Sequence, residues 1–142
     1  MKLFLLFLAL VSWPSLVSGL LGLGRLQSIA VTGKLTCNGQ PAKDVKIKLY
    51  EKEKIKDIKL DEMYTDASGS FHVSGSKTEI TNIDPKVNIY HRCDRTAPCY
   101  RKLGITIPDQ YITSGGVPRK TYDIGTLNLG NIYYGETVDC IN

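Results

Sequence analysis

The sequence lacks several features that would assign it to a familiar class of protein. No apolar run approaches the roughly 20 residues that a membrane-spanning helix needs, so we expect no transmembrane segment. No glycine-rich loop precedes a helix as in a phosphate-binding site, and no serine has the context of a hydrolase nucleophile. Clustered arginines are missing from a chain whose net charge is only +4, which argues against nucleic acid as a partner. No Asn-x-Ser/Thr triplet occurs, so we expect no N-linked glycan.

The amino terminus has the pattern of a secretory signal peptide. Met1 and Lys2 precede an uncharged apolar run, Leu3 to Val11, and small residues follow at Val17-Ser18-Gly19. A short basic start, an apolar stretch of about ten residues and a small-residue exit are typical of cleaved leaders. We therefore interpret residues 1–19 as a leader and residues 20–142 as one secreted, extracellular domain.

The four cysteines lie in the predicted secreted part, at Cys37, Cys93, Cys99 and Cys140. An even count in an exported chain indicates two disulfides, for which three connectivities exist. We favour Cys93–Cys99, which would close a turn between neighbouring strands, and Cys37–Cys140, which would tie the last residues to the first strand. A metal site of His91, Cys93 and Cys99 is the competing interpretation. Its spacing matches no four-ligand zinc pattern, so we predict no metal and no cofactor.

Alternating apolar and polar residues dominate the predicted domain. Ile29, Val31 and Leu35 share one face of a strand, and Val45, Ile47 and Leu49 share another. Asp66 to Gly69 predicts a tight turn in which Gly69 adopts a positive φ. The pattern predicts an all-β fold, an antiparallel β-sandwich of seven to eight short strands. The expected strands cover residues 29–35, 45–50, 62–65, 70–74, 86–93, 100–107 and 121–129, with an edge strand within 132–138.

Glu51 to Leu60 is the only segment that invites a helical interpretation. Its apolar residues form too small a stripe to dock a long helix, so we expect a charged connection with about one helical turn.

Four blocks of sequence carry a resemblance to a known family: residues 31–41 with 45–51, residues 65–71, the Ile89-Tyr90-His91-Arg92-Cys93 segment with residues 99–102 and 107–108, and residues 122–129. Together these blocks resemble the nematode transthyretin-like family of secreted proteins. The resemblance implies a transthyretin-like β-sandwich and export. Some members of that family bridge phosphatidylserine on dying cells to a receptor on phagocytes, so an anionic phospholipid headgroup and a cell-surface receptor are the implied partners.

Other transthyretin folds do not transfer their sites to this sequence. Hydrolases of the urate pathway end in Tyr-Arg-Gly-Ser, whereas this chain ends Val138-Asp139-Cys140-Ile141-Asn142. The only histidines are His72 and His91, so no catalytic residue is assigned and we predict that the protein is not an enzyme. By strand parity, His91 should be buried and hydrogen-bonded, and His72 should face solvent. Transport of a small apolar ligand, as in vertebrate transthyretin, is the alternative function.

The candidate binding residues lie in a lysine-rich stretch, residues 43–59, which holds seven lysines against four acidic residues. We assign headgroup contact to Lys46, Lys48, Lys52 and Lys54, because cations near an anionic surface contribute about 1 kcal/mol each. Lysines that merely solvate a strand face and protect a sheet edge are the alternative. The tyrosines of the carboxy-terminal third fit either a protein interface or ordinary half-burial at strand ends, and the oligomeric state stays open. They are Tyr100, Tyr111, Tyr122, Tyr133 and Tyr134.

Overall fold

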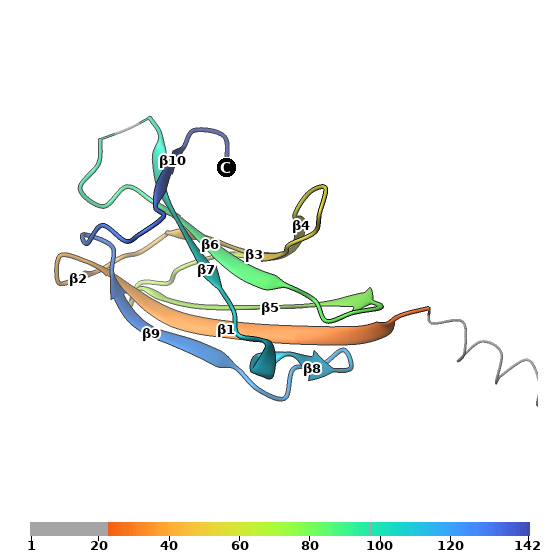
Figure 1. The fold of residues 1–142 in the computed structure, drawn as a ribbon. Helices are drawn as coiled ribbons and strands as arrows, with labels where there is room; N and C mark the ends of the chain where they lie inside the picture. The colour runs from red at the N-terminus through yellow and green to blue at the C-terminus, as the bar shows by residue number, and fades with distance from the viewer. Residues whose placement is uncertain (1–22, 97) are drawn as a thin grey trace, which may run out of the picture.

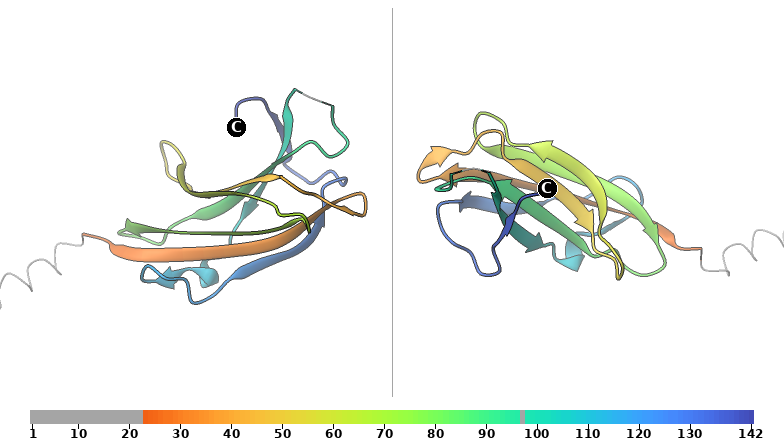
Figure 2. Two further views of the ribbon diagram at one scale, coloured as in Figure 1. Left: turned by 180° about the vertical axis from the view of Figure 1, so that it is seen from behind. Right: turned by 90° about the horizontal axis from the view of Figure 1, so that it is seen from above.

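The strands form two five-stranded sheets that pack face to face in a computed structural model describing residues 23–96 and 98–142 (Figures 1 and 2). The predicted leader, residues 1–19, lies outside the described residues. The first sheet centres on β1 (Arg25–Cys37), which pairs with β2 (Gln40–Pro41), β5 (Ser70–Glu79), β8 (Thr113–Ser114) and β9 (Tyr122–Asn128). The second sheet has the order β10 (Thr137–Asp139), β7 (Tyr100–Thr106), β6 (Pro85–His91), β3 (Lys46–Glu51) and β4 (Ile58–Tyr64).

Strand alternation places the core where the sequence predicts it. Ile29, Val31 and Leu35 of β1 are fully buried, and they pack with Ile47 and Leu49 of β3. All strand pairs are antiparallel except β1 with β9, which is parallel. The predicted β-sandwich is therefore confirmed.

Two tight turns contain residues with positive φ, and the second confirms the turn predicted at Asp66 to Gly69. Asn38 and Gly39, with φ of 51° and 89°, form the two-residue connection between β1 and β2. Gly69 adopts φ 83°, and a Cβ there would lie 2.2 Å from the Leu35 carbonyl oxygen. Only glycine fits that position without displacing backbone.

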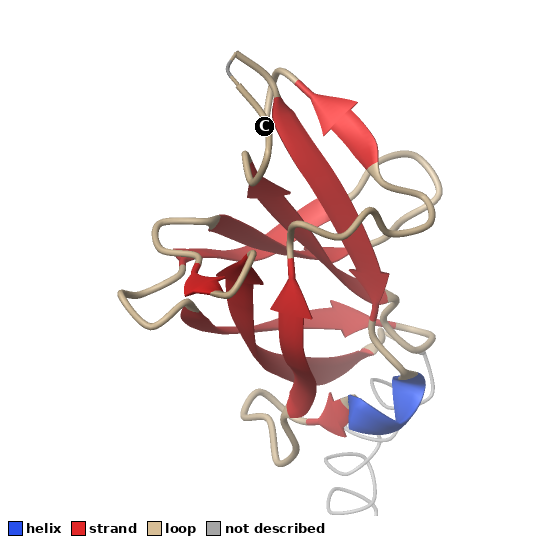
Figure 3. Ribbon diagram, turned by 90° about the vertical axis from the view of Figure 1, so that its left-hand side faces the viewer, coloured by secondary structure: helices blue, strands red, loops and turns tan. Residues whose placement is uncertain are grey.

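The segment from Glu51 to Leu60 contains no helical turn, so that prediction is wrong. β3 extends through Glu51, and β4 begins at Ile58 and pairs with β3 along its length. Pairing with an existing strand satisfies backbone groups that a single helical turn would leave unpaired. Among the described residues, the 3₁₀ turn Asp109–Tyr111 is the helical segment (Figure 3).

The disulfides join different cysteines from those we favoured. Cys37 pairs with Cys93 at a Cα separation of 5.7 Å, and Cys99 pairs with Cys140 at 4.4 Å. The register of β10 on β7 places Asp139 opposite Tyr100, so the next residues outward, Cys140 and Cys99, meet. Cys93 is buried and meets Cys37 at the end of β1, so this bond joins the two sheets. Because the sulfurs of Cys93 and Cys99 are both in disulfides, the alternative metal site of His91, Cys93 and Cys99 is also excluded.

Candidate functional site

The four lysines assigned to headgroup binding fall into two separate groups. Lys46 and Lys48 project from the outer face of β3 and alternate with core-facing Ile47 and Leu49. Lys52 and Lys54 lie beyond the end of β3, in the loop that leads to β4. The sequence placed them in one run, but the end of the strand divides them.

Lys46 and Lys48 are already engaged on the outer face of the second sheet. The Lys46 ammonium donates a hydrogen bond to Asn142 Oδ1 at 2.9 Å. The Lys48 ammonium lies 5.2 Å from the centre of the Tyr90 ring, and Lys102 lies 5.9 Å from the same ring. Tyr90 is only 4% exposed beneath them, and burial raises the pKa of its phenol to about 12. This face is a packed layer whose cations have partners.

The loop between β3 and β4, residues 52–57, presents its cations differently. Lys52, Lys54 and Lys56 are exposed, and no ion pair joins them to any residue that the structure describes. Ile55 stands between two of these lysines and is 97% exposed. The Lys52 amide donates to the Asp84 carbonyl at 2.8 Å, which fixes the base of the loop against its neighbour. The result is an isolated apolar side chain surrounded by free positive charges.

A hollow of about 480 Å³ lies under this loop, and three glutamates are among the residues that line it. Glu51 occupies the last core-facing position of β3 and is only 4% exposed. One oxygen each from Glu51, Glu53 and Glu79 lie within 4.8 Å of one another. Burial raises the pKa of Glu51 to about 7, with a contribution from neighbouring Glu53. Hydrogen bonding to Lys77 lowers the pKa of Glu53, so Glu53 holds a negative charge more readily than Glu51 does.

Only part of this carboxylate cluster is apparent from the sequence. Alternation along β3 places Glu51 on the inner face, which is a readable signal. Its partners come from a loop and from the end of β5, so only the packing of the two sheets brings them together.

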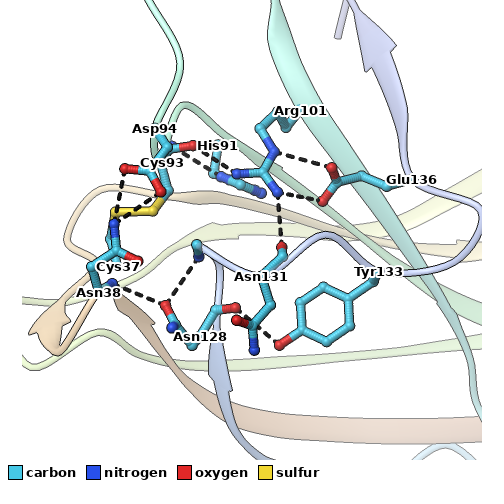
Figure 4. A network of polar contacts seen from close by, with 11 residues as sticks. Cys37, Asn38, His91, Cys93, Asp94, Arg101, Asn128, Asn131, Tyr133 and Glu136 are labelled. Carbon is cyan, nitrogen blue, oxygen red and sulfur yellow. Dashed lines mark hydrogen bonds and ion pairs between the residues drawn. A yellow bond between two sulfur atoms is a disulfide. The ribbon is translucent and has the colours of Figure 1, made fainter.

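His91 confirms the parity argument and belongs to a buried polar network (Figure 4). It is 3% exposed, and its Nδ1 accepts a hydrogen bond from the Cys93 amide at 3.0 Å. Burial, together with a smaller effect of the Arg101 charge, lowers the pKa of His91 to about 4. His72 is exposed, also as predicted. A neutral, enclosed imidazole of this kind has a structural role.

Arg101 is the centre of the same network and holds the carboxy-terminal segment on the second sheet. Its guanidinium makes a bidentate ion pair with Glu136, with both N–O distances 3.0 Å (Figure 4). It also donates to the carbonyl oxygens of Cys93 at 2.7 Å and Asn131 at 2.8 Å. Both charged side chains are about 10% exposed, so this pair is enclosed. With its donors occupied, Arg101 has little capacity for an external ligand.

The tyrosines of the carboxy-terminal third are mostly used within the fold. Tyr111 and Tyr122 pack at a ring separation of 4.8 Å, and the Tyr133 hydroxyl donates to the Asn128 carbonyl. Tyr100 lies under the Arg92 guanidinium. Of these rings, Tyr134 is fully exposed. The alternative of half-buried tyrosines at strand ends is therefore the better description for most of them.

The described residues also bear on the alternative of an apolar-ligand carrier. The hollow under the 52–57 loop is lined by acidic and basic side chains, including Glu51, Glu79 and Lys52. Sites for small apolar ligands are lined mainly by hydrophobic groups, so this hollow does not favour such a ligand.

No helix in the described part of the chain is both long enough and apolar enough to cross a bilayer.

Comparison with known proteins decides the family. The model described as TTR-52, transthyretin-like family, matches residues 32–108. The chain belongs to the transthyretin-like family. Transthyretin-like protein 5 of Caenorhabditis elegans is 42% identical over the full length of both chains. Transthyretin-like protein 46 of the same organism is 44% identical, covering 95% of this chain and 74% of its own. Transthyretin-like protein 1 is 43% identical, over 92% of this chain and 88% of its own.

Membership of the transthyretin-like family supports a binding or adaptor role, and the family is generally non-enzymatic. Two disulfides are compatible with secretion. A 9R-lipoxygenase from Cyanothece matches at a TM-score of 0.42 and 20% identity, over 72% of this chain and 16% of its own, which is too distant for a functional comparison.

Proposed function

We propose that this transthyretin-like protein is an extracellular adaptor that contacts anionic phospholipid headgroups, phosphatidylserine in particular, and presents them to a cell-surface receptor. The observation that carries the proposal is the loop of residues 52–57. Ile55 is 97% exposed there, and the flanking Lys52, Lys54 and Lys56 have no ion-pair partner among the described residues. An apolar side chain that inserts between headgroups, flanked by cations that bind them, suits an anionic bilayer surface.

The expected affinity of one loop is modest. Three lysines contribute about 3 kcal/mol near an anionic surface. Burial of the Ile55 side chain adds about 2 kcal/mol. Together these terms favour the membrane by about three to four powers of ten, before the cost of immobilising the protein. Linked copies or a bound receptor would be needed for lasting attachment.

Vesicle flotation at physiological salt tests the proposal. The secreted protein should float with vesicles that contain phosphatidylserine and stay behind with neutral vesicles. Reversal of the loop charges in a Lys52→Glu, Lys54→Glu, Lys56→Glu variant should abolish flotation. Reversal of three exposed lysines on other elements, Lys34, Lys43 and Lys120, changes net charge equally and should preserve most of it.

The outcome also separates the two lysine groups. Loss of binding in a Lys46→Gln, Lys48→Gln variant, with the loop variant unaffected, would move the contact to the outer face of β3. Equal flotation with neutral and anionic vesicles, or no flotation with either, would reject headgroup recognition altogether.

A further inference from the structure

The three glutamates under the 52–57 loop have a geometry that the fold alone does not explain. Glu51 ends β3 at a core-facing position, and Glu79 ends β5 on the face that also carries buried Phe71 and Val73. Their carboxylate oxygens and that of Glu53 lie within 4.8 Å of one another. Two oxygens that bind one calcium ion at about 2.4 Å can be at most about 4.8 Å apart. The spacing therefore allows all three carboxylates to reach a common ion.

The internal counter-charge does not satisfy this cluster. Lys77 donates to Glu53 Oε1 at 2.9 Å and also to Glu79 Oε1, and it makes no hydrogen bond to Glu51. Glu51 is only 4% exposed, and its Oε2 has no hydrogen-bond partner among the described residues. A buried carboxylate oxygen without a donor is costly, and buried charges normally have a partner or bind a metal. One ammonium against three carboxylates leaves room for a divalent charge.

We propose that Glu51, Glu53 and Glu79 form a binding site for a divalent cation of the calcium class. All the donors are carboxylate oxygens, which hard cations prefer, and they come from two strands and a loop. Lys77 occupies the Oε1 atoms of two of them, so their second oxygens stay available to an ion.

The surroundings set the expected affinity. Asn82 and Asp84 also line the hollow, whose volume of about 480 Å³ holds the water molecules that would complete an irregular coordination shell. Lys52 and Lys54 line it as well, and their charges together with Lys77 oppose a cation. We therefore expect weak binding, with a Kd of about 10⁻⁴ to 10⁻³ M, the range of extracellular calcium modules.

The site is tested without membranes, so its failure would leave headgroup binding untouched. Calcium should be titrated calorimetrically into the chelator-treated secreted protein, with magnesium in parallel, and thermal unfolding measured at each concentration. Saturable binding and a rise in Tm of about 5 °C at tenfold excess over the Kd are expected. Glu51→Gln should bind at least tenfold more weakly, while its Tm in chelator equals or exceeds that of the parent because a buried charge has been removed.

Two further variants make the result decisive. Lys77→Met removes the competing ammonium and should bind calcium several-fold more tightly. Glu62→Gln removes a lysine-paired carboxylate from the outer face of the second sheet and should leave binding unchanged. Absence of saturable binding at millimolar calcium, or equal affinity in the parent and Glu51→Gln, would overturn the proposal. Weaker binding in Lys77→Met would overturn the assignment of ligands.

Discussion

The disulfide that joins the two sheets should matter more to stability than the one that joins the tail. In the loop-entropy treatment, sequence separations of 56 and 41 residues give about 4 kcal/mol for each bond. Cys93 is buried, and its bond to Cys37 connects the two sheets. Removal of this disulfide therefore increases the conformational entropy of the unfolded chain and leaves the folded state constrained by its packing. Cys140 is exposed and lies just after β10, so its release also lets the tail move in the folded state. That gain in folded-state entropy offsets part of the stability lost when the Cys99–Cys140 bond is removed.

We therefore expect Cys37→Ala, Cys93→Ala to lower the free energy of unfolding by about 4 kcal/mol, and Cys99→Ala, Cys140→Ala by about 2 kcal/mol. The first pair corresponds to a fall in Tm of about 15 °C. Urea unfolding followed by circular dichroism measures both, and mass mapping of non-reduced peptides verifies the pairing in the parent. Equal losses in the two double variants, or a greater loss from the tail pair, would refute the reasoning.

Three further predictions concern the buried polar network and the turn at Gly69. Glu136→Ala should cost about 3 kcal/mol in chemical unfolding, because it leaves the Arg101 charge enclosed without its partner; a loss below about 1 kcal/mol would show that solvent reaches the guanidinium. The folded-state pKa of His91 lies near 4, below its ordinary 6.5, so its contribution to stability is present above pH 6.5 and falls by about 3 kcal/mol as pH drops towards 4. His91→Asn, which keeps an acceptor for the Cys93 amide, should lose that part of the pH dependence in acid titrations. Gly69→Ala should lower stability by about 2 kcal/mol or more, because it forces a side chain into positive φ against backbone; unchanged thermal unfolding would contradict the turn geometry.

Strand positions and the core were predictable because alternation is a local signal. Ile47 and Leu49 face inward for the same reason that Lys46 and Lys48 face outward, and neither fact depends on distant parts of the chain. The positive φ at Gly69 was predictable from the turn sequence alone. These features depend on neighbouring residues and on stereochemistry, which the sequence states directly.

Contacts between sheets and the register at sheet edges could not be predicted in the same way. The pairing of Cys99 with Cys140 follows from β10 adding to β7, a choice that many short edge segments could make. Glu51 was visible as an inward carboxylate, but Glu79 lies on the other sheet, and nothing local indicates that the two meet. Long-range packing, which composition does not encode, decided each of these features.

The most direct test of the adaptor proposal is whether the tip of the 52–57 loop enters an anionic bilayer. Trp13 is the only tryptophan in the sequence and lies within the predicted leader, so Ile55→Trp gives the secreted protein a single reporter at the tip. On vesicles containing phosphatidylserine, its fluorescence should shift to shorter wavelength and be quenched by lipids brominated near the headgroup, and neither change should occur with neutral vesicles. An unchanged, unquenched spectrum while the protein floats with the vesicles would show that another surface makes the contact.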